Sequence, residues 1–87
     1  MKYQEGLDST KAWLRTACKE EIETILEKAG LSDQKARIIL LKYCKEKSRF
    51  HISTDDKVNL NESGVSKKTT AALRKIHAAL QWLGILD

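Results

Sequence analysis

The sequence predicts an all-α protein, a compact bundle of four helices that forms a single domain over residues 1–87. The chain has no proline and only four glycines, and leucine, alanine, lysine and glutamate, which favour helices, are abundant. Val58 and Val65 are the only valines, whereas a sheet protein would carry more β-branched residues in alternation. So short a chain buries only about 60% of its unfolded surface, which argues against a deep catalytic pocket.

The first helix is expected over residues 8–29, after a loose polar lead-in at residues 1–6. Asp8 or Ser9 can cap its start, and Gly30 is suited to a left-handed C-terminal cap. Steps of three and four residues give this helix one apolar stripe. The stripe consists of Leu14, Cys18, Ile22, Ile25 and Ala29, with Leu26 beside it.

A second helix is expected to begin after a Ser32 cap and to end near Lys47 or Ser48. Its predicted apolar stripe is Ala36, Ile39, Leu40, Tyr43 and Cys44. The segment that follows, residues 49–53, is expected to be a loop that Phe50 and Ile52 anchor to the core.

The last third of the chain, residues 54–83, predicts two helices around a turn at Gly64. The first would start at Ser53 or Thr54, with Asp55 and Asp56 favourable in its first turn, and end near Ser63. The second would be capped by Ser66 and run over residues 67–83, with Gly84 as its stop. Its apolar stripe is Leu73, Ile76, Leu80 and Leu83, and a hydrophobic tail of Ile85 and Leu86 folds back.

Residues 59–76 resemble the helix-turn-helix of bacterial and phage transcription proteins. In that pattern an apolar residue precedes the turn glycine by four, another follows it, a cap comes next, and buried positions lie six and nine residues after the glycine. These positions hold Leu60, Gly64, Val65, Ser66, Thr70 and Leu73. Leu60 departs from the pattern, because the family usually has alanine there.

A wider stretch, residues 31–83, resembles sigma factor region four and related phage late-transcription regulators. The resemblance implies a small transcription regulator, from a phage or mobile element, that binds double-stranded DNA with the second helix of the motif. It also implies RNA polymerase or another host protein as a partner.

The distribution of charge agrees with a DNA partner. The net charge is +4, and residues 66–81 contain four cations and no acid, while residues 35–49 contain six cations and one acid. Ala71, Ala72 and the basic residues of the second helix are expected to face the major groove, and the earlier cations to hold the phosphate backbone. The predicted DNA-binding residues are Ser66, Lys67, Lys68, Ala71, Arg74 and Lys75, with Lys42, Lys45, Lys47 and Arg49.

Trp13 and Trp82 lie beside the main apolar stripes rather than on them. One interpretation is that they pack at the edge of the core. The other is that they form a dimer or partner interface, which supports an alternative function: a helical interaction module that binds or inhibits a host protein. A homodimer would match a two-fold DNA site.

No catalytic residue, metal site or cofactor is predicted, and the chain is not expected to be an enzyme. Cys18 and Cys44 form no CxxC and are expected to be buried and reduced, and His51 and His77 stand at no ligand-like spacing from them. The longest purely apolar run, residues 38–41, is too short to cross a membrane, and no signal peptide is recognised. A cytoplasmic location is therefore expected.

Overall fold

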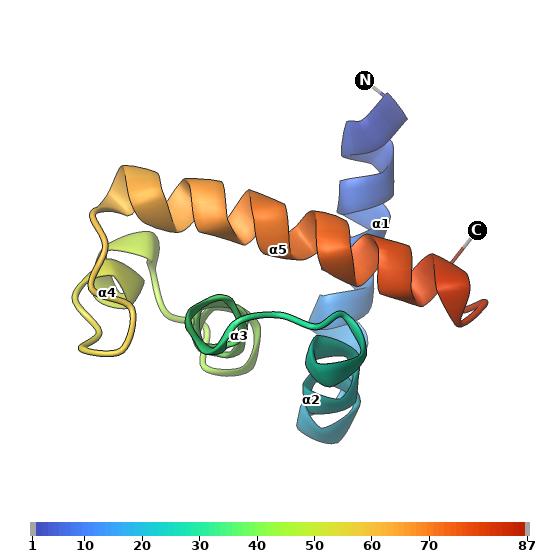
Figure 1. The fold of residues 1–87 in the computed structure, drawn as a ribbon, viewed down its shortest axis with the longest axis horizontal. Helices are drawn as coiled ribbons and strands as arrows, with labels where there is room; N and C mark the ends of the chain where they lie inside the picture. Colours follow the sequence, from blue (N-terminus) through green and yellow to red (C-terminus); the bar gives the residue numbers. More distant parts are fainter. Residues whose placement is uncertain (1, 87) are drawn as a thin grey trace. The chain divides into compact units, whose positions relative to one another are not determined.

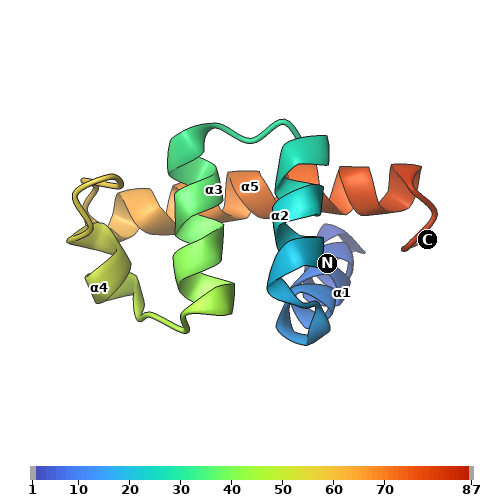
Figure 2. The ribbon, with the colours of Figure 1, turned by 90° about the horizontal axis from the view of Figure 1, so that it is seen from below.

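A computed structural model describes residues 2–86, with side chains described from Leu7 onward, and all the regular secondary structure in these residues is helical (Figures 1 and 2). The predicted all-α class is confirmed, but the described chain has five α-helices rather than four, and the fourth is only one turn long. The elements are α1 (Lys2–Thr16), α2 (Lys19–Lys28), α3 (Asp33–Ile39), the π-helical turn η1 (Leu40–Cys44), α4 (Arg49–Ser53) and α5 (Glu62–Trp82).

The chain divides into two compact units that share α5. The central unit is Leu31–Ala72, which contains α3, η1, α4 and the first half of α5. The terminal unit combines the chain up to Gly30 with the chain from Leu73 on, and so contains α1, α2 and the second half of α5. Within the central unit, α3 crosses the first half of α5 steeply, as both views show (Figures 1 and 2).

The terminal unit corrects the prediction of one long first helix. The helix begins already at Lys2, where a loose lead-in was expected, and it breaks at Cys18, whose backbone is extended with φ −76° and ψ 165°. Glu21 reaches back so that its Oε1 accepts from the Cys18 backbone N–H at 2.9 Å. This bond starts α2 as a separate helix, since it satisfies an amide at the helix end. Cys18 is exposed, and its predicted burial is wrong.

The core of this unit otherwise follows the predicted stripes. Its buried apolar side chains are Leu14, Ile22, Ile25, Leu26, Leu73, Ile76 and Leu80. Gly30 and Gly84 adopt positive φ of 67° and 77°, which confirms both as C-terminal stops. After Gly84 the chain folds back, and the Ile85 N–H donates to the Leu80 carbonyl at 2.9 Å. Leu83 was expected in the apolar stripe, but it is 41% exposed because the chain reverses immediately after it.

The central unit closes around Ile38, Leu41, Ile52, Val58 and Val65, with Leu60 packed against them. Ser32 caps α3, and its Oγ accepts from the Lys35 N–H at 3.3 Å as predicted. The stripe of the second helix is nevertheless shifted. Ile39 is buried as predicted, and Ile38 and Leu41 are buried in addition, whereas Leu40 and Cys44 are half-buried. The π-helical hydrogen bonds of η1 add a residue to the turn and rotate the side chains from Leu40 onward, which accounts for the partial exposure of Leu40 and Cys44 but not for the burial of Ile38, which precedes the turn.

The segment predicted as a loop, residues 49–53, is the short helix α4. The hydroxyl of Ser48 caps it and accepts from the His51 N–H at 3.3 Å. Ile52 is 1% exposed and anchors the segment as expected, but Phe50 is 59% exposed and anchors nothing. A one-turn helix places these two side chains on different faces, so only one of them can reach the core.

The predicted turn at Gly64 is wrong. Residues 54–61 contain no helix, and α5 begins at Glu62 and runs without a break through Gly64 and Ser66. Asn61 supplies the cap instead, because its Oδ1 accepts from the Gly64 N–H at 2.6 Å. Ser66 is therefore inside the helix rather than at its start. The helix-turn-helix that was expected over residues 54–83 is not present in this form.

Long-range pairing explains why residues 54–58 form a turn. The Asp55 carboxylate accepts from the Arg37 guanidinium at 3.0 Å and from the Lys57 backbone N–H at 2.9 Å. The carboxylate that was expected to favour a helix start is thus held by α3 and by a local turn, which is the use that aspartate commonly has in loops.

Candidate nucleic-acid interface

The two units differ sharply in charge. The central unit contains nine lysines and arginines and five acidic residues, whereas the terminal unit contains seven of each. The whole net charge of +4 therefore lies in residues 31–72. Because the field of a protein depends on where its charges lie, the positive field is expected to be stronger at the central unit than at the terminal one.

The exposed side of α5 is the most uniform part of the basic surface. Lys67, Lys68, Arg74 and Lys75 are all exposed, and after Glu62 the helix contains no acidic residue. The opposite side faces the core with Val65, Thr69, Ala72, Leu73, Ile76 and Leu80. The helical period of 3.6 residues separates these two sets, so the cations are directed to solvent along the helix.

Two predicted DNA contacts on α5, Ala71 and Ala72, are not exposed. Ala72 is fully buried, so the expectation that it reaches a groove is wrong. Ala71 is half-buried between the two sides of the helix. Thr70 was expected to face the core, but it is half-buried and Thr69 is the buried threonine, with its Oγ1 donating to the Val65 carbonyl at 2.7 Å. The rest of the inner side keeps the predicted phase, because Leu73, Ile76 and Leu80 are buried.

Arg49 and Ser66 hold the start of α5. The Arg49 Nη1 donates to the Ser66 Oγ at 3.0 Å, and its Nε donates to a Glu62 carboxylate oxygen at 3.4 Å. Both residues were predicted to contact DNA. In the structure the guanidinium of Arg49 forms hydrogen bonds that join α4 to the first turns of α5. It therefore positions the helix that carries Lys67 and Lys68.

Lysines of the loop after η1 add to the basic surface. Lys45 and Lys47 are exposed, and Glu46 between them adopts a left-handed conformation with φ 53°. Lys42 is exposed as well, with its Nζ 5.7 Å from the centre of the Tyr43 ring. The positions of these three lysines are compatible with the predicted phosphate contacts.

Two residues of the central unit were not singled out from the sequence. Lys57 is exposed and adds a cation to the unit, and Arg37 is a half-buried partner of Asp55. The Arg37 guanidinium lowers the pKa of the Asp55 carboxyl, and that carboxylate raises the pKa of Arg37. Counting charge by compact unit, rather than along the sequence, would have included Lys57.

Each histidine takes part in a hydrogen bond, His77 with a residue distant in sequence and His51 with a residue of the same turn. His77 Nδ1 lies 3.0 Å from the Thr10 hydroxyl, and His51 Nδ1 lies 2.8 Å from the Ser48 hydroxyl. Within residues 2–86 no group of three or more histidine, cysteine, aspartate or glutamate side chains is placed to hold a metal ion. The same described part of the chain contains no helix that is both long enough and apolar enough to cross a membrane.

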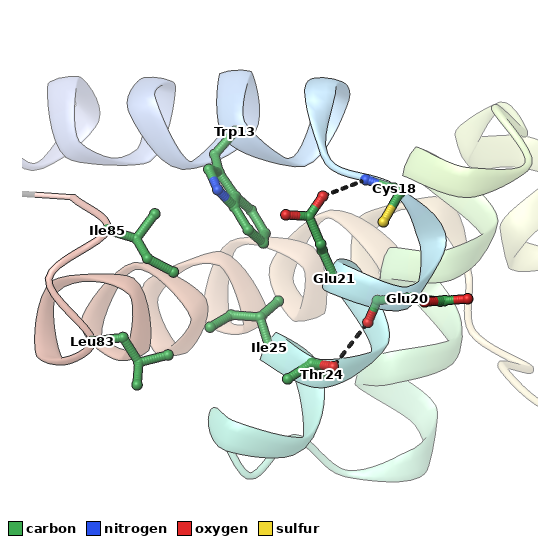
Figure 3. A pocket seen from close by; sticks show the side chains of 8 residues that line it. All are labelled: Trp13, Cys18, Glu20, Glu21, Thr24, Ile25, Leu83 and Ile85. Carbon is green, nitrogen blue, oxygen red and sulfur yellow. Dashed lines mark hydrogen bonds between the residues drawn. The ribbon is translucent and has the colours of Figure 1, made fainter.

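The two tryptophans both belong to the terminal unit but differ in environment. Trp13 is half-buried and lines a shallow hollow beside α2 (Figure 3), whereas Trp82 is 85% exposed. Packing at the edge of the core therefore describes Trp13, and it does not describe Trp82.

Comparisons of the chain with protein-family models, with curated proteins and with solved structures find no match. The function must therefore be argued from the charges and contacts themselves.

Proposed function

We propose that the protein binds double-stranded DNA through the lysines of its central unit. The observation that carries this proposal is the separation of charge: the entire net charge of +4 lies in residues 31–72. A DNA duplex presents one negative charge per about 1.7 Å of its axis, and lysines that neutralise phosphates release bound counterions. The lysines of the central unit are the groups on this chain best placed for such contacts.

Lys67 and Lys68 form the centre of the proposed surface. They are exposed on α5, and the Asn61 cap and the Arg49 contacts to Glu62 and Ser66 hold the helix start that carries them. A fixed helix end lets two adjacent cations meet phosphates without a large loss of backbone freedom. Lys45 and Lys47 extend the same basic unit.

Contacts of this kind position a duplex but carry little sequence information. Ala72 is buried and cannot read a base, so the expected discrimination between duplex sequences is small. A regulatory role in transcription rests only on the resemblance of residues 31–83 to sigma factor region four, and it remains a prediction.

The test is fluorescence anisotropy with a labelled 20-base-pair duplex at 50 and 200 mM salt. We expect the observed binding constant to fall steeply with salt, and the double variant K67E/K68E to lose at least about tenfold at 50 mM salt with a shallower salt dependence. The matched control is K19E/K28E, which changes the net charge equally at two exposed lysines of the terminal unit.

Two results would overturn the proposal. One is the absence of binding at 50 mM salt. The other is an equal loss in the two double variants, because net charge alone would then account for the interaction. Circular dichroism of both variants checks that the helical content is unchanged.

A further inference from the structure

An exposed apolar patch lies at the end of α5 in the terminal unit. The patch consists of Trp82, Leu83 and Ile85, which are 85%, 41% and 48% exposed. Among the described residues these are three of the four large apolar side chains with high exposure, and the fourth is Phe50 of the central unit. Exposed apolar residues that cluster, rather than occurring singly, indicate an interaction surface.

A hollow of about 330 Å³ adjoins this patch (Figure 3). Its apolar lining comes from Trp13, Ile25, Leu83 and Ile85, and Glu20 and Glu21 of α2 belong to its edge. Figure 3 shows Leu83 and Ile85 at one end and Glu21 at the other, with Trp13 and Ile25 between them, while the Glu20 side chain extends outward from α2. The volume is at the lower limit for small-molecule sites, so it is suited to one large side chain.

We propose that a second copy of the chain covers this surface, in a two-fold pair in which Trp82 of each copy enters the hollow of the other. A two-fold interface needs a projecting group and its receptor on the same patch. This chain meets that requirement, because Trp82 directly precedes Leu83 and is separated from Ile85 by only two residues, and both of these line the hollow. Tryptophan seated in an apolar pocket is a frequent source of binding energy.

The charges around the hollow are complementary to the helix that carries Trp82. From Glu20 to Glu27 the helix α2 has four acidic residues and no cation, and two of those acids line the hollow. The helix α5 has no acid after Glu62, and its exposed Lys75 precedes Trp82 by seven residues, two turns earlier on the same side of the helix. A second copy that inserts Trp82 thus brings a lysine toward the carboxylates. Lys75 belongs to the terminal unit, and this pairing does not depend on DNA binding.

The first test is sedimentation equilibrium from 1 to 500 µM without DNA. We expect reversible dimers that are lost in W82A and retained in F50A, which removes the exposed aromatic side chain of the central unit. Neither residue is buried, so neither change should unfold the chain. A wild-type protein that remains monomeric throughout, or an equal loss in F50A, would overturn the proposal.

A mixing experiment tests the charges. We expect K75E and E20K each to weaken the dimer about tenfold, since each places like charges across both halves of a two-fold pair. An equal mixture should restore association, because every charged pair in the mixed dimer is then of opposite sign. A mixture that associates no better than its components contradicts the pairing.

The third measurement is alkylation of Cys18, which is exposed and contributes to the hollow. We expect its modification rate, followed by mass spectrometry, to fall at concentrations that favour the dimer in the wild type and to stay constant in W82A. Cys44 of the central unit is the internal reference. An unprotected Cys18 in a dimeric sample would place the interface elsewhere, and it would leave the K67E/K68E result unaffected.

Discussion

The central and terminal units differ in what they present to solvent. The central unit carries the net charge and exposes lysines, whereas the terminal unit is neutral in sum and exposes Trp82, Leu83 and Ile85. Both units nevertheless bury a similar kind of aliphatic core. The buried residues of the two units therefore account for the fold of this chain, and the exposed residues indicate where partners would bind.

The basic residues of the central unit are themselves divided by type. Its two arginines, Arg37 and Arg49, are paired with Asp55 and Glu62 and join separate segments. Most of its lysines are exposed. This division follows from chemistry, since the planar guanidinium donates several directed hydrogen bonds and the ammonium acts as a mobile point charge. Charge reversal at lysines should therefore affect binding, while changes at these arginines should affect the fold.

The largest expected difference between the units comes from isoleucine truncation. Ile38 in the central core is fully buried, and I38A should lower the free energy of unfolding by about 2–5 kcal/mol, because a cavity replaces its packing. Ile85 in the terminal patch is 48% exposed, and I85A should cost less than about 0.5 kcal/mol. Urea unfolding followed by circular dichroism measures both. Similar losses would show that the patch is part of a folded core.

A smaller difference is expected between glycines. Gly30 ends α2 with φ 67°, so G30A should destabilise the protein by about 1–2 kcal/mol through left-handed strain. Gly64 lies inside α5, where alanine gains about 1 kcal/mol in helix propensity. Its added methyl would lie 3.1 Å from the Asn61 Oδ1 and 3.3 Å from the Leu60 Cβ. These effects oppose each other, so G64A should be nearly neutral.

Thermal unfolding of both glycine variants distinguishes the observed helix from the turn that the sequence predicted. If G64A lowers the stability as much as G30A does, Gly64 would lie in a turn rather than inside α5, and the predicted helix-turn-helix would be supported.

The smallest expected effect concerns pH. Each unit contains a carboxyl with a lowered pKa: Asp55, through hydrogen bonds from Arg37, and Glu21, through hydrogen bonds from Cys18. A lowered folded-state pKa contributes stability above the ordinary values of 3.8 and 4.5, and this contribution is lost as pH falls through the lowered values. D55N and E21Q should therefore lose less stability than the wild type between pH 5 and pH 2.5.

Urea midpoints at pH 7, 5, 4 and 2.5 give this comparison, with D56N as the control for removal of an exposed carboxylate. High salt should weaken the Asp55 effect more than the Glu21 effect, because the first depends on a charged partner and the second on a backbone amide. A D55N curve parallel to that of the wild type would contradict the proposed contribution of the Arg37 pair.

Much of the fold could be predicted from interactions between residues that are close in the sequence. The absence of proline and the spacing of apolar residues predicted an all-helical chain, and Ser32, Gly30 and Gly84 cap or end helices where expected. Such features depend on one side chain and the backbone within a few residues of it, so they can be recognised without knowledge of the fold. The buried Ile76 and Leu80 follow from the helical period in the same way.

Most features of the candidate sites could not be predicted without the tertiary structure. The sequence predicted a helix start near Asp55 and a turn at Gly64. In the structure Asp55 pairs with Arg37, which lies 18 residues earlier, and Asn61 caps the start of α5. The exposed lysines of α5 were predicted, yet the assignment of charge to one unit requires knowing which segments pack together.

The sequence by itself determined that this protein is helical, where several helices end and that its later part is basic, because these properties arise from neighbouring residues. Only the tertiary structure decided that α1 and α2 separate at Cys18, that α5 is continuous, that Trp82 is exposed and that Leu83 and Ile85 line a hollow with residues of α1 and α2. Those features result from competition between local preferences and contacts distant in sequence. Asp55 is compatible locally with a helix start and with a turn, and its contact with Arg37 stabilises the turn.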